Sequence, residues 1–273
     1  MIITAADGTP LAFDITPSTG ASSEAGGVPV LLLHGSVLTR AIWRGLGYVD
    51  ALREQRPVIR MDLRGHGTSG KPHHASAYAQ AVLVRDVMAV LDAAGADRAH
   101  LVGYSLGARS ALAAAITHPD RIASLTCLGG SADDQRGAID QVFFPGTIAT
   151  LRSGGMEAFC DAQGLTPEAV AEHPRRRASR HVFMTADPLA IAALFEATES
   201  TPAIPDDDLR ACSVPALWMT GTEDRPRFEQ SQRAADVMPD ARFVPLEGRS
   251  HAATLWPSGP VLEHLVPHLA AHD

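Results

Sequence analysis

Short apolar runs alternate with longer helical patterns along most of the chain, and this alternation constrains the fold more than any other feature. Six runs read as strands buried on both faces: residues 28–33, 58–61, 100–102, 125–128, 215–219 and 242–244. Helical patterns follow several of them, at residues 77–94, 106–117, 228–237 and 261–271. A hairpin that turns at Asp7-Gly8 precedes them. The pattern predicts an α/β fold with a mostly parallel, eight-stranded sheet that helices cover on both faces.

One long stretch interrupts the alternation. Residues 133–208 contain helical pieces at 156–162, 167–172 and 189–198 but no recognisable strand. An insertion between two core strands lies over the carboxyl edge of the sheet, where ligands bind in open α/β sheets. We therefore predict a core of residues 1–132 and 209–273, with residues 133–208 as a helical cap. Residues 17–27, rich in Ser, Gly and Ala, are predicted to form a surface loop.

The predicted strand at residues 100–102 runs into Gly-Tyr-Ser-Leu-Gly, residues 103–107, and then into a helix. This is the G-x-S-x-G pattern in the strand–turn–helix setting that presents a nucleophile. Glycines flank the turn because side chains would clash there. Ser105 is the predicted nucleophile, and the backbone N–H of Leu106 is placed to stabilise an oxyanion. A chance match and a plain helix N-cap are the alternatives, although a cap does not account for both glycines.

A serine needs a neighbouring base, and the chain has twelve histidines. Where an elbow of this kind supplies the serine, the acid and then the histidine follow along the chain, on loops after late strands. Asp224 follows the strand at 215–219 and His251 follows the strand at 242–244, so both are expected at the edge where Ser105 lies. We predict His251 as the base and Asp224 as its acid. Three rival acids stay open: Glu223, Asp133 and Asp134.

The charge balance narrows the range of partners. With 23 basic and 31 acidic residues the chain has a net charge of −8, whereas nucleic acids and anionic membranes attract basic surfaces. No run reaches the roughly 18 apolar residues of a membrane span, and the sequence does not begin with a basic, apolar leader. Three scattered cysteines indicate neither a disulfide framework nor a zinc site. We predict a cytoplasmic protein that acts on a small molecule without a metal; the sequence does not indicate an oligomeric state.

Five motifs together resemble those of the α/β-hydrolase fold family, over nearly the whole chain. They are residues 33–36 (Leu-His-Gly-Ser), 62–67 (Asp-Leu-Arg-Gly-His-Gly), 103–107, 221–224 (Gly-Thr-Glu-Asp) and 248–251 (Gly-Arg-Ser-His). The resemblance implies that the backbone N–H of Ser36 is the second oxyanion-hole donor, and that His34 and His66 shape loops. The resemblance also explains the glycines of residues 65–70. These glycines match the G-x-G-x-x-G fingerprint of dinucleotide-binding proteins, in which an acidic residue ends the second strand. Here the corresponding residue, Asp86, falls inside a helical pattern, so no cofactor is expected.

The predicted reaction is hydrolysis of an ester, lactone or related acyl bond of a small molecule by a Ser-His-Asp triad. The fold alone does not select the bond. Arg109, four residues after the nucleophile, is either a clamp for a substrate carboxylate or a structural arginine at the core edge. His34 and Trp43 are further candidates for substrate contact. Basic residues of the predicted cap are candidates for extending an anionic site: Arg152, Arg175, Arg176, Arg177 and Arg180.

Two other functions stay open. The elbow followed by Arg109 is similar to that of a carbon–oxygen lyase of the menaquinone pathway, in which the resemblance implies that the triad abstracts a proton. A non-catalytic receptor on the same fold is the other alternative. Such proteins commonly lose a triad residue, whereas this chain keeps all three candidates.

Overall fold

The structure of the protein is a computed structural model that describes residues 1–20 and 27–273. Its centre is one sheet of eight strands in the order β1-β2-β4-β3-β5-β6-β7-β8, parallel throughout except that β1 and β2 are antiparallel to their neighbours. The mostly parallel sheet predicted from the alternation is thereby confirmed. The strands are β1 (Ile2–Thr4), β2 (Pro10–Thr16), β3 (Val30–Leu33), β4 (Val58–Met61), β5 (Ala99–Tyr104), β6 (Ile122–Leu128), β7 (Ala216–Gly221) and β8 (Ala241–Leu246).

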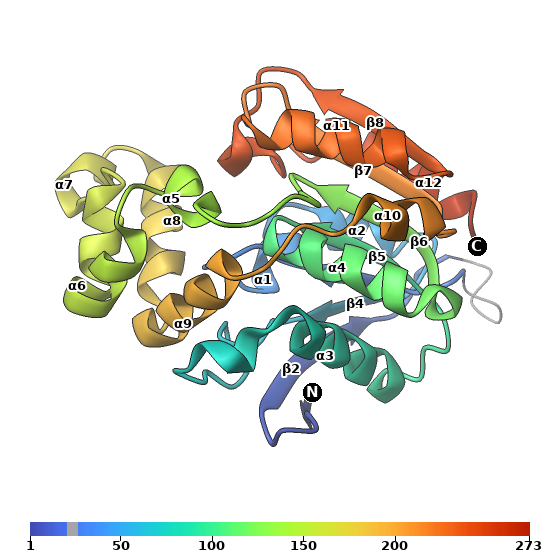
Figure 1. Cartoon of the computed structure of the whole chain (residues 1–273), viewed down its shortest axis with the longest axis horizontal. Helices are drawn as coiled ribbons and strands as arrows, with labels where there is room; N and C mark the ends of the chain where they lie inside the picture. The colour runs from blue at the N-terminus through green and yellow to red at the C-terminus, as the bar shows by residue number, and fades with distance from the viewer. Residues whose placement is uncertain (21–26) are drawn as a thin grey trace.

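Helices cover both faces of this sheet, each over its own apolar layer (Figure 1). One face carries α3 (Gln80–Ala93), α4 (Leu106–Thr117), α10 (Asp206–Ala211) and α11 (Arg227–Val237). The other carries α1 (Ala41–Gly45), α2 (Tyr48–Leu52) and α12 (Gly259–Ala270). The central strands β3 to β7 are buried on both sides, which explains their continuous apolar runs.

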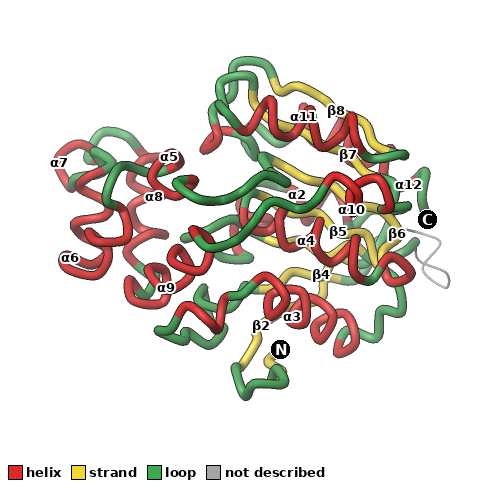
Figure 2. Tube along the Cα trace, viewed as in Figure 1, coloured by secondary structure: helices red, strands yellow, loops and turns green. Residues whose placement is uncertain are grey.

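A lobe without described strands lies between β6 and β7 (Figure 2). It consists of α5 (Ala138–Val142), α6 (Thr147–Ala162), α7 (Pro167–Val170), α8 (Pro174–Met184) and α9 (Pro188–Glu199). The lobe packs around an apolar cluster that contains Phe159 and Phe195 and extends to Val37 and Tyr78 of the core, and it projects to one side of the sheet in Figure 1. We keep residues 133–208 as the proposed cap, noting that residue 208 falls inside α10.

Several elements differ from the sequence pattern for local reasons. The helix predicted over residues 77–94 is a 3-10 turn, η1 (Ala75–Tyr78), followed by α3, because Ala79 between them is extended with ψ 142°. Helix α8 was not predicted, because most of its residues are polar and its few apolar side chains, among them Val182 and Phe183, are only partly buried. The loop predicted over residues 17–27 lies largely outside the described residues. Within the described part of the chain, no helix combines the length and apolar character needed to cross a membrane.

Candidate active site

The turn between β5 and α4 holds Ser105 in a strained backbone conformation, with φ +53° and ψ −111°. A Cβ atom added at Gly103 would overlap the backbone of Gly107, and one added at Gly107 would overlap the carbonyl of Leu33 on β3. The two glycines are therefore required by close backbone contacts rather than by flexibility. A non-glycine residue at positive φ is costly, and such strain is found mainly at functional sites.

Two hydrogen bonds connect the side chains of Ser105, His251 and Asp224. The Nδ1 atom of His251 lies 2.7 Å from Oδ2 of Asp224, and its Nε2 atom lies 3.0 Å from Oγ of Ser105. A neutral imidazole protonated on Nδ1 satisfies both contacts, because Nδ1–H donates to the carboxylate while Nε2 accepts from the hydroxyl. Asp224 follows β7, and His251 begins the turn η3 (His251–Ala253) after β8.

The rival acids have other positions. Glu223 and Asp134 are both exposed. Asp133 forms an ion pair with Arg233 at 2.5 Å. The structure thus brings Asp224, rather than any of these three, to the imidazole.

The environment of His251 favours its neutral form. Burial lowers the pKa of the imidazole, the hydrogen bond that it donates to Asp224 opposes this, and the cation of Arg227 lowers the pKa further. The ring stacks on Tyr104 with centroids 5.3 Å apart, and the Tyr104 hydroxyl donates to the carbonyl of His251 at 2.9 Å. These contacts hold the ring in place as a free base that can accept a proton at Nε2.

The loop after β3 brings the backbone of Ser36 to the same place, and Ser36 and Leu106 both border the cavity described below. Two buried histidines shape this loop. His34 contacts the carbonyl of Gly35 through Nδ1 at 2.8 Å and accepts from the N–H of Leu63 through Nε2 at 3.0 Å. His66 accepts from the N–H of Val37 at 3.0 Å. Both rings are therefore used by the loop itself.

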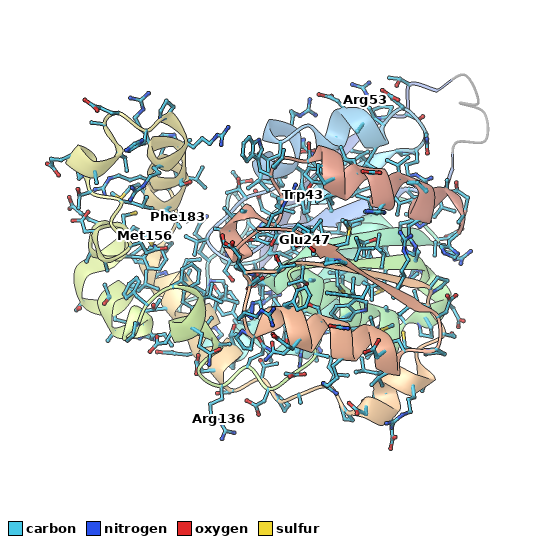
Figure 3. The ribbon with its side chains drawn as sticks, turned by 90° about the horizontal axis from the view of Figure 1, so that it is seen from above. Trp43, Arg53, Arg136, Met156, Phe183 and Glu247 are labelled. Atoms are coloured by element: carbon cyan, nitrogen blue, oxygen red, sulfur yellow. The ribbon has the colours of Figure 1, made fainter. Side chains whose placement is uncertain are left out.

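A cavity of about 720 Å³ opens between the carboxyl edge of the sheet and the helical lobe, and Ser105 and His251 lie on its wall. Most of its lining is apolar and comes from both sides: Leu38, Ile42 and Leu255 from the core, and Val142, Phe143 and Phe183 from the lobe. Phe183 lies on the side of the lobe that faces the core in Figure 3. A cavity of this size and character fits a small organic molecule.

Two residues proposed for substrate contact lie elsewhere. His34 is fully buried with both ring nitrogens engaged, and it does not line the cavity. Trp43 is also fully buried; it packs edge-on against Tyr48 at 5.2 Å, inside the core (Figure 3). The structure corrects both expectations, because neither side chain reaches the cavity.

Arg109 lines the cavity, but its guanidinium is engaged by the protein. It donates to the carbonyls of Ser131 at 3.0 Å, Asp133 at 3.1 Å and Pro202 at 2.5 Å. These carbonyls belong to the two segments that connect the lobe to the core. Its buried Nε–H has no described partner. Burial lowers the pKa of Arg109 to about 10. Of the two alternatives for Arg109, these contacts favour the structural arginine over the carboxylate clamp.

The basic residues of the lobe are mostly paired as well. Arg152 binds Glu196 at 2.7 Å and Arg180 binds Asp161 at 2.8 Å, while Arg176 donates to the carbonyl of Gly164. Only Arg175 of the five lines the cavity. A different cation, Arg227, also lines the cavity and was not among the predicted site residues. Its position three residues after Asp224 was the available signal.

Comparisons with known proteins agree with this architecture. Residues 28–158 match a family model described as alpha/beta hydrolase fold. The chain is 30% identical to a 2-hydroxy-6-oxo-2,4-heptadienoate hydrolase of Pseudomonas putida, covering 73% of each chain. It is 30% identical to a pimeloyl-[acyl-carrier protein] methyl ester esterase of Aeromonas hydrophila, covering 83% of this chain and 89% of that one. The crystal structure of an enol-lactonase from Burkholderia xenovorans superposes with a TM-score of 0.83 at 26% identity, over 99% and 100% of the two chains.

Proposed function

The chain belongs to the α/β-hydrolase fold family, and we propose that this hydrolase cleaves an ester, lactone or related acyl bond of a small molecule with Ser105 as nucleophile. The observation that carries the proposal is the pair of hydrogen bonds from Asp224 through His251 to Ser105, on the wall of a largely apolar cavity. Relatives named as an ester esterase, an enol-lactonase and a heptadienoate hydrolase support acyl chemistry of this kind.

In the proposed first step, Oγ of Ser105 attacks the carbonyl carbon of the substrate while His251 takes the hydroxyl proton at Nε2. The imidazolium that forms keeps its Nδ1–H on Asp224, whose charge stabilises it. The carbonyl oxygen becomes an oxyanion, and we assign its stabilisation to the backbone N–H groups of Ser36 and Leu106. Collapse of the tetrahedral intermediate transfers the Nε2 proton to the leaving oxygen and leaves an acyl-serine.

In the second step, His251 removes a proton from water, and the hydroxide attacks the acyl-serine. The acid product leaves, and Ser105 regains its proton. A lactone would follow the same course, with its leaving oxygen tethered to the acyl group. The lyase alternative depends on Arg109 as a carboxylate clamp, and three of its N–H donors contact backbone carbonyls instead. No specific observation favours the lyase.

The direct test compares Ser105→Ala with a matched serine variant on p-nitrophenyl esters. We expect Ser105→Ala to lower kcat by roughly a thousandfold or more, as removal of a triad nucleophile does. Ser153→Ala is the control, because Ser153 is exposed on α6 and its hydroxyl donates only within its own helix, to Ala149. A fluorophosphonate probe should label the wild-type protein and the control but not Ser105→Ala.

Each alternative has its own signature in this experiment. Labelling of Ser105 without turnover of esters or lactones would reject hydrolysis and favour the lyase. Failure of the probe to label folded wild-type protein would reject an activated serine altogether and favour a receptor.

A further inference from the structure

The cavity wall is cationic although the protein is acidic. Among the described residues that line it, three are arginines, Arg109, Arg175 and Arg227, and none is an aspartate or glutamate. The whole chain, by contrast, carries a net charge of −8. A mostly apolar cavity focuses the field of such cations, because its walls screen charge poorly. The charge of the wall therefore favours an anionic ligand over a neutral one.

Two of the three arginines have local uses. Arg109 donates to three backbone carbonyls of the segments that connect the lobe. Arg175, on the exposed helix α8, places its guanidinium 3.4 Å from the ring centroid of Trp256, which is itself 43% exposed. Arg175 is thus a cation at the solvent side of the cavity, held on an aromatic face.

Arg227 differs from both. It begins α11 and lies three residues after Asp224, and its guanidinium makes no hydrogen bond or ion pair with any described residue. Its Nε atom is buried without a partner. The nearby acids are occupied, since Asp224 accepts from His251 and Glu229 pairs with Arg225. An arginine has five N–H donors, and leaving them desolvated and unpaired costs free energy.

We propose that Arg227 binds a carboxylate of the substrate, so that the preferred substrates are small esters or lactones that carry a second, ionised carboxyl group. This inference rests on the proposed function of Ser105. A carboxylate is the anion that matches a guanidinium with two parallel hydrogen bonds, and the rest of the lining suits a short hydrocarbon between the two ends of the molecule.

A bound carboxylate also affects the triad. The titratable groups that act on Arg227 are the Asp224 carboxylate and the neutral Tyr104 phenol, and the cation of Arg227 in turn lowers the pKa of His251. During acylation the imidazole becomes an imidazolium, which an uncompensated Arg227 opposes. A substrate carboxylate neutralises Arg227 at that moment. A neutral substrate leaves the Arg227 cation uncompensated, so the preference for anionic substrates is expected in kcat as well as in KM.

The experiment compares p-nitrophenyl hydrogen succinate, which is anionic, with p-nitrophenyl butyrate, which is neutral and has the same acyl chain length. We expect Arg227→Met to lower the anionic-to-neutral ratio of kcat/KM by about 10- to 100-fold, the loss typical of a hydrogen bond to a charged group. Compared with Arg227→Met, Arg227→Lys should recover part of the ratio, because lysine keeps the positive charge but lacks the two parallel N–H donors of the guanidinium. Arg225→Met, two residues earlier in the chain and exposed, should keep the wild-type ratio.

A binding measurement separates this inference from the proposed function. Calorimetry with monomethyl succinate compares the Ser105→Ala protein with the Ser105→Ala/Arg227→Met double variant, and it needs no turnover. Weaker binding by the double variant supports the anion site even if the wild-type protein hydrolyses neither ester. Equal binding, or an equal loss of kcat/KM on both esters, overturns the site while leaving Ser105 as the nucleophile. The proposed anion site is also overturned if Arg225→Met lowers the anionic-to-neutral ratio of kcat/KM as much as Arg227→Met does.

Discussion

The buried arginines of the core and the arginines of the cavity wall differ in what neutralises them. In the core, Arg64 binds Asp86 through two N–H groups at 2.5 and 2.7 Å and Asp7 at 2.8 Å, and Arg56 binds both oxygens of Asp273 at 2.6 and 3.1 Å. On the cavity wall, Arg109 has only carbonyl partners and Arg227 has no described partner. Carboxylates thus neutralise Arg64 and Arg56 in the core, whereas Arg227 on the cavity wall has none and is expected to receive one from a ligand.

The largest effect of breaking this pattern is expected at Asp86. Asp86→Ala leaves the buried Arg64 without its bidentate partner, and removing one member of a buried pair costs about 3–5 kcal/mol. Urea unfolding monitored by circular dichroism measures this loss. Asp92→Ala on the same helix is the control; its pair with Arg121 is exposed, so its loss should stay below about 1 kcal/mol. Equal losses in the two variants would contradict the assignment.

A smaller loss is expected at Asp273. Arg56 is 1% exposed, but Asp273 is 38% exposed, so water partly replaces the lost carboxylate in Asp273→Ala. We expect the free energy of unfolding to fall by about 1–3 kcal/mol. Asp236→Ala, on the exposed side of α11, should change it by no more than about 0.5 kcal/mol. The same urea titration compares them, and an unchanged Asp273→Ala would show that Arg56 does not need its partner.

The buried contact between Arg56 and His100 also predicts that the free energy of unfolding depends on pH. Burial, followed by the neighbouring Arg56 cation, lowers the pKa of His100 to about 4. Its Nε2 accepts from Arg56 at 2.7 Å and its Nδ1 contacts Ser124 at 2.8 Å, so the folded ring is neutral. Below about pH 6.5 the unfolded chain binds a proton at His100 that the folded chain does not bind. The free energy of unfolding therefore decreases as the pH is lowered.

The slope contributed by His100 is at most about 1.4 kcal/mol per pH unit between roughly pH 6 and pH 4.5. His100→Gln removes this titration, so its unfolding free energy should depend less steeply on pH than that of the wild type. Urea unfolding at several pH values measures both slopes. Parallel slopes would mean that folded His100 protonates normally.

The smallest effect on stability is expected at Arg227. Arg227→Met loses no protein partner and keeps an apolar stem of similar length, so the free energy of unfolding should change by less than about 0.5 kcal/mol or rise. Thermal and urea unfolding check this. A loss of more than about 2 kcal/mol would mean that Arg227 supports the fold as Arg64 does, and the contrast between core and cavity wall would disappear.

The local features of the site were predictable from the sequence because they depend on neighbours in the chain. The turn at Ser105 follows from the glycines at 103 and 107, whose backbones contact each other. Chain order and strand position led to His251 and Asp224, and these residues do lie within hydrogen-bonding distance of each other. The central strands β3 to β7 were predictable because their burial on both faces leaves a continuous apolar run, whereas the edge strand β8 is partly exposed.

The roles of the arginines were not predictable, since they depend on segments far away in the sequence. Arg109 and Arg227 each follow a triad candidate by one helical turn or less. The two arginines differ because the backbone carbonyls of residues 131, 133 and 202 accept hydrogen bonds from Arg109 but not from Arg227. Trp43 is similar, because nothing in the local sequence shows that it packs against Tyr48 under the sheet.

The contacts of Arg109 have a consequence for how such a protein can be altered. One side chain, on the helix that starts after Ser105, ties together the segment that leaves the core and the segment that returns to it. These two segments form the boundary between the core, which carries the proposed triad, and the lobe that we propose selects the substrate. Exchange of the lobe between residues 133 and 202 would replace the lobe's share of the cavity wall and leave Ser105 unchanged, as long as the new connecting segments still present carbonyls to Arg109.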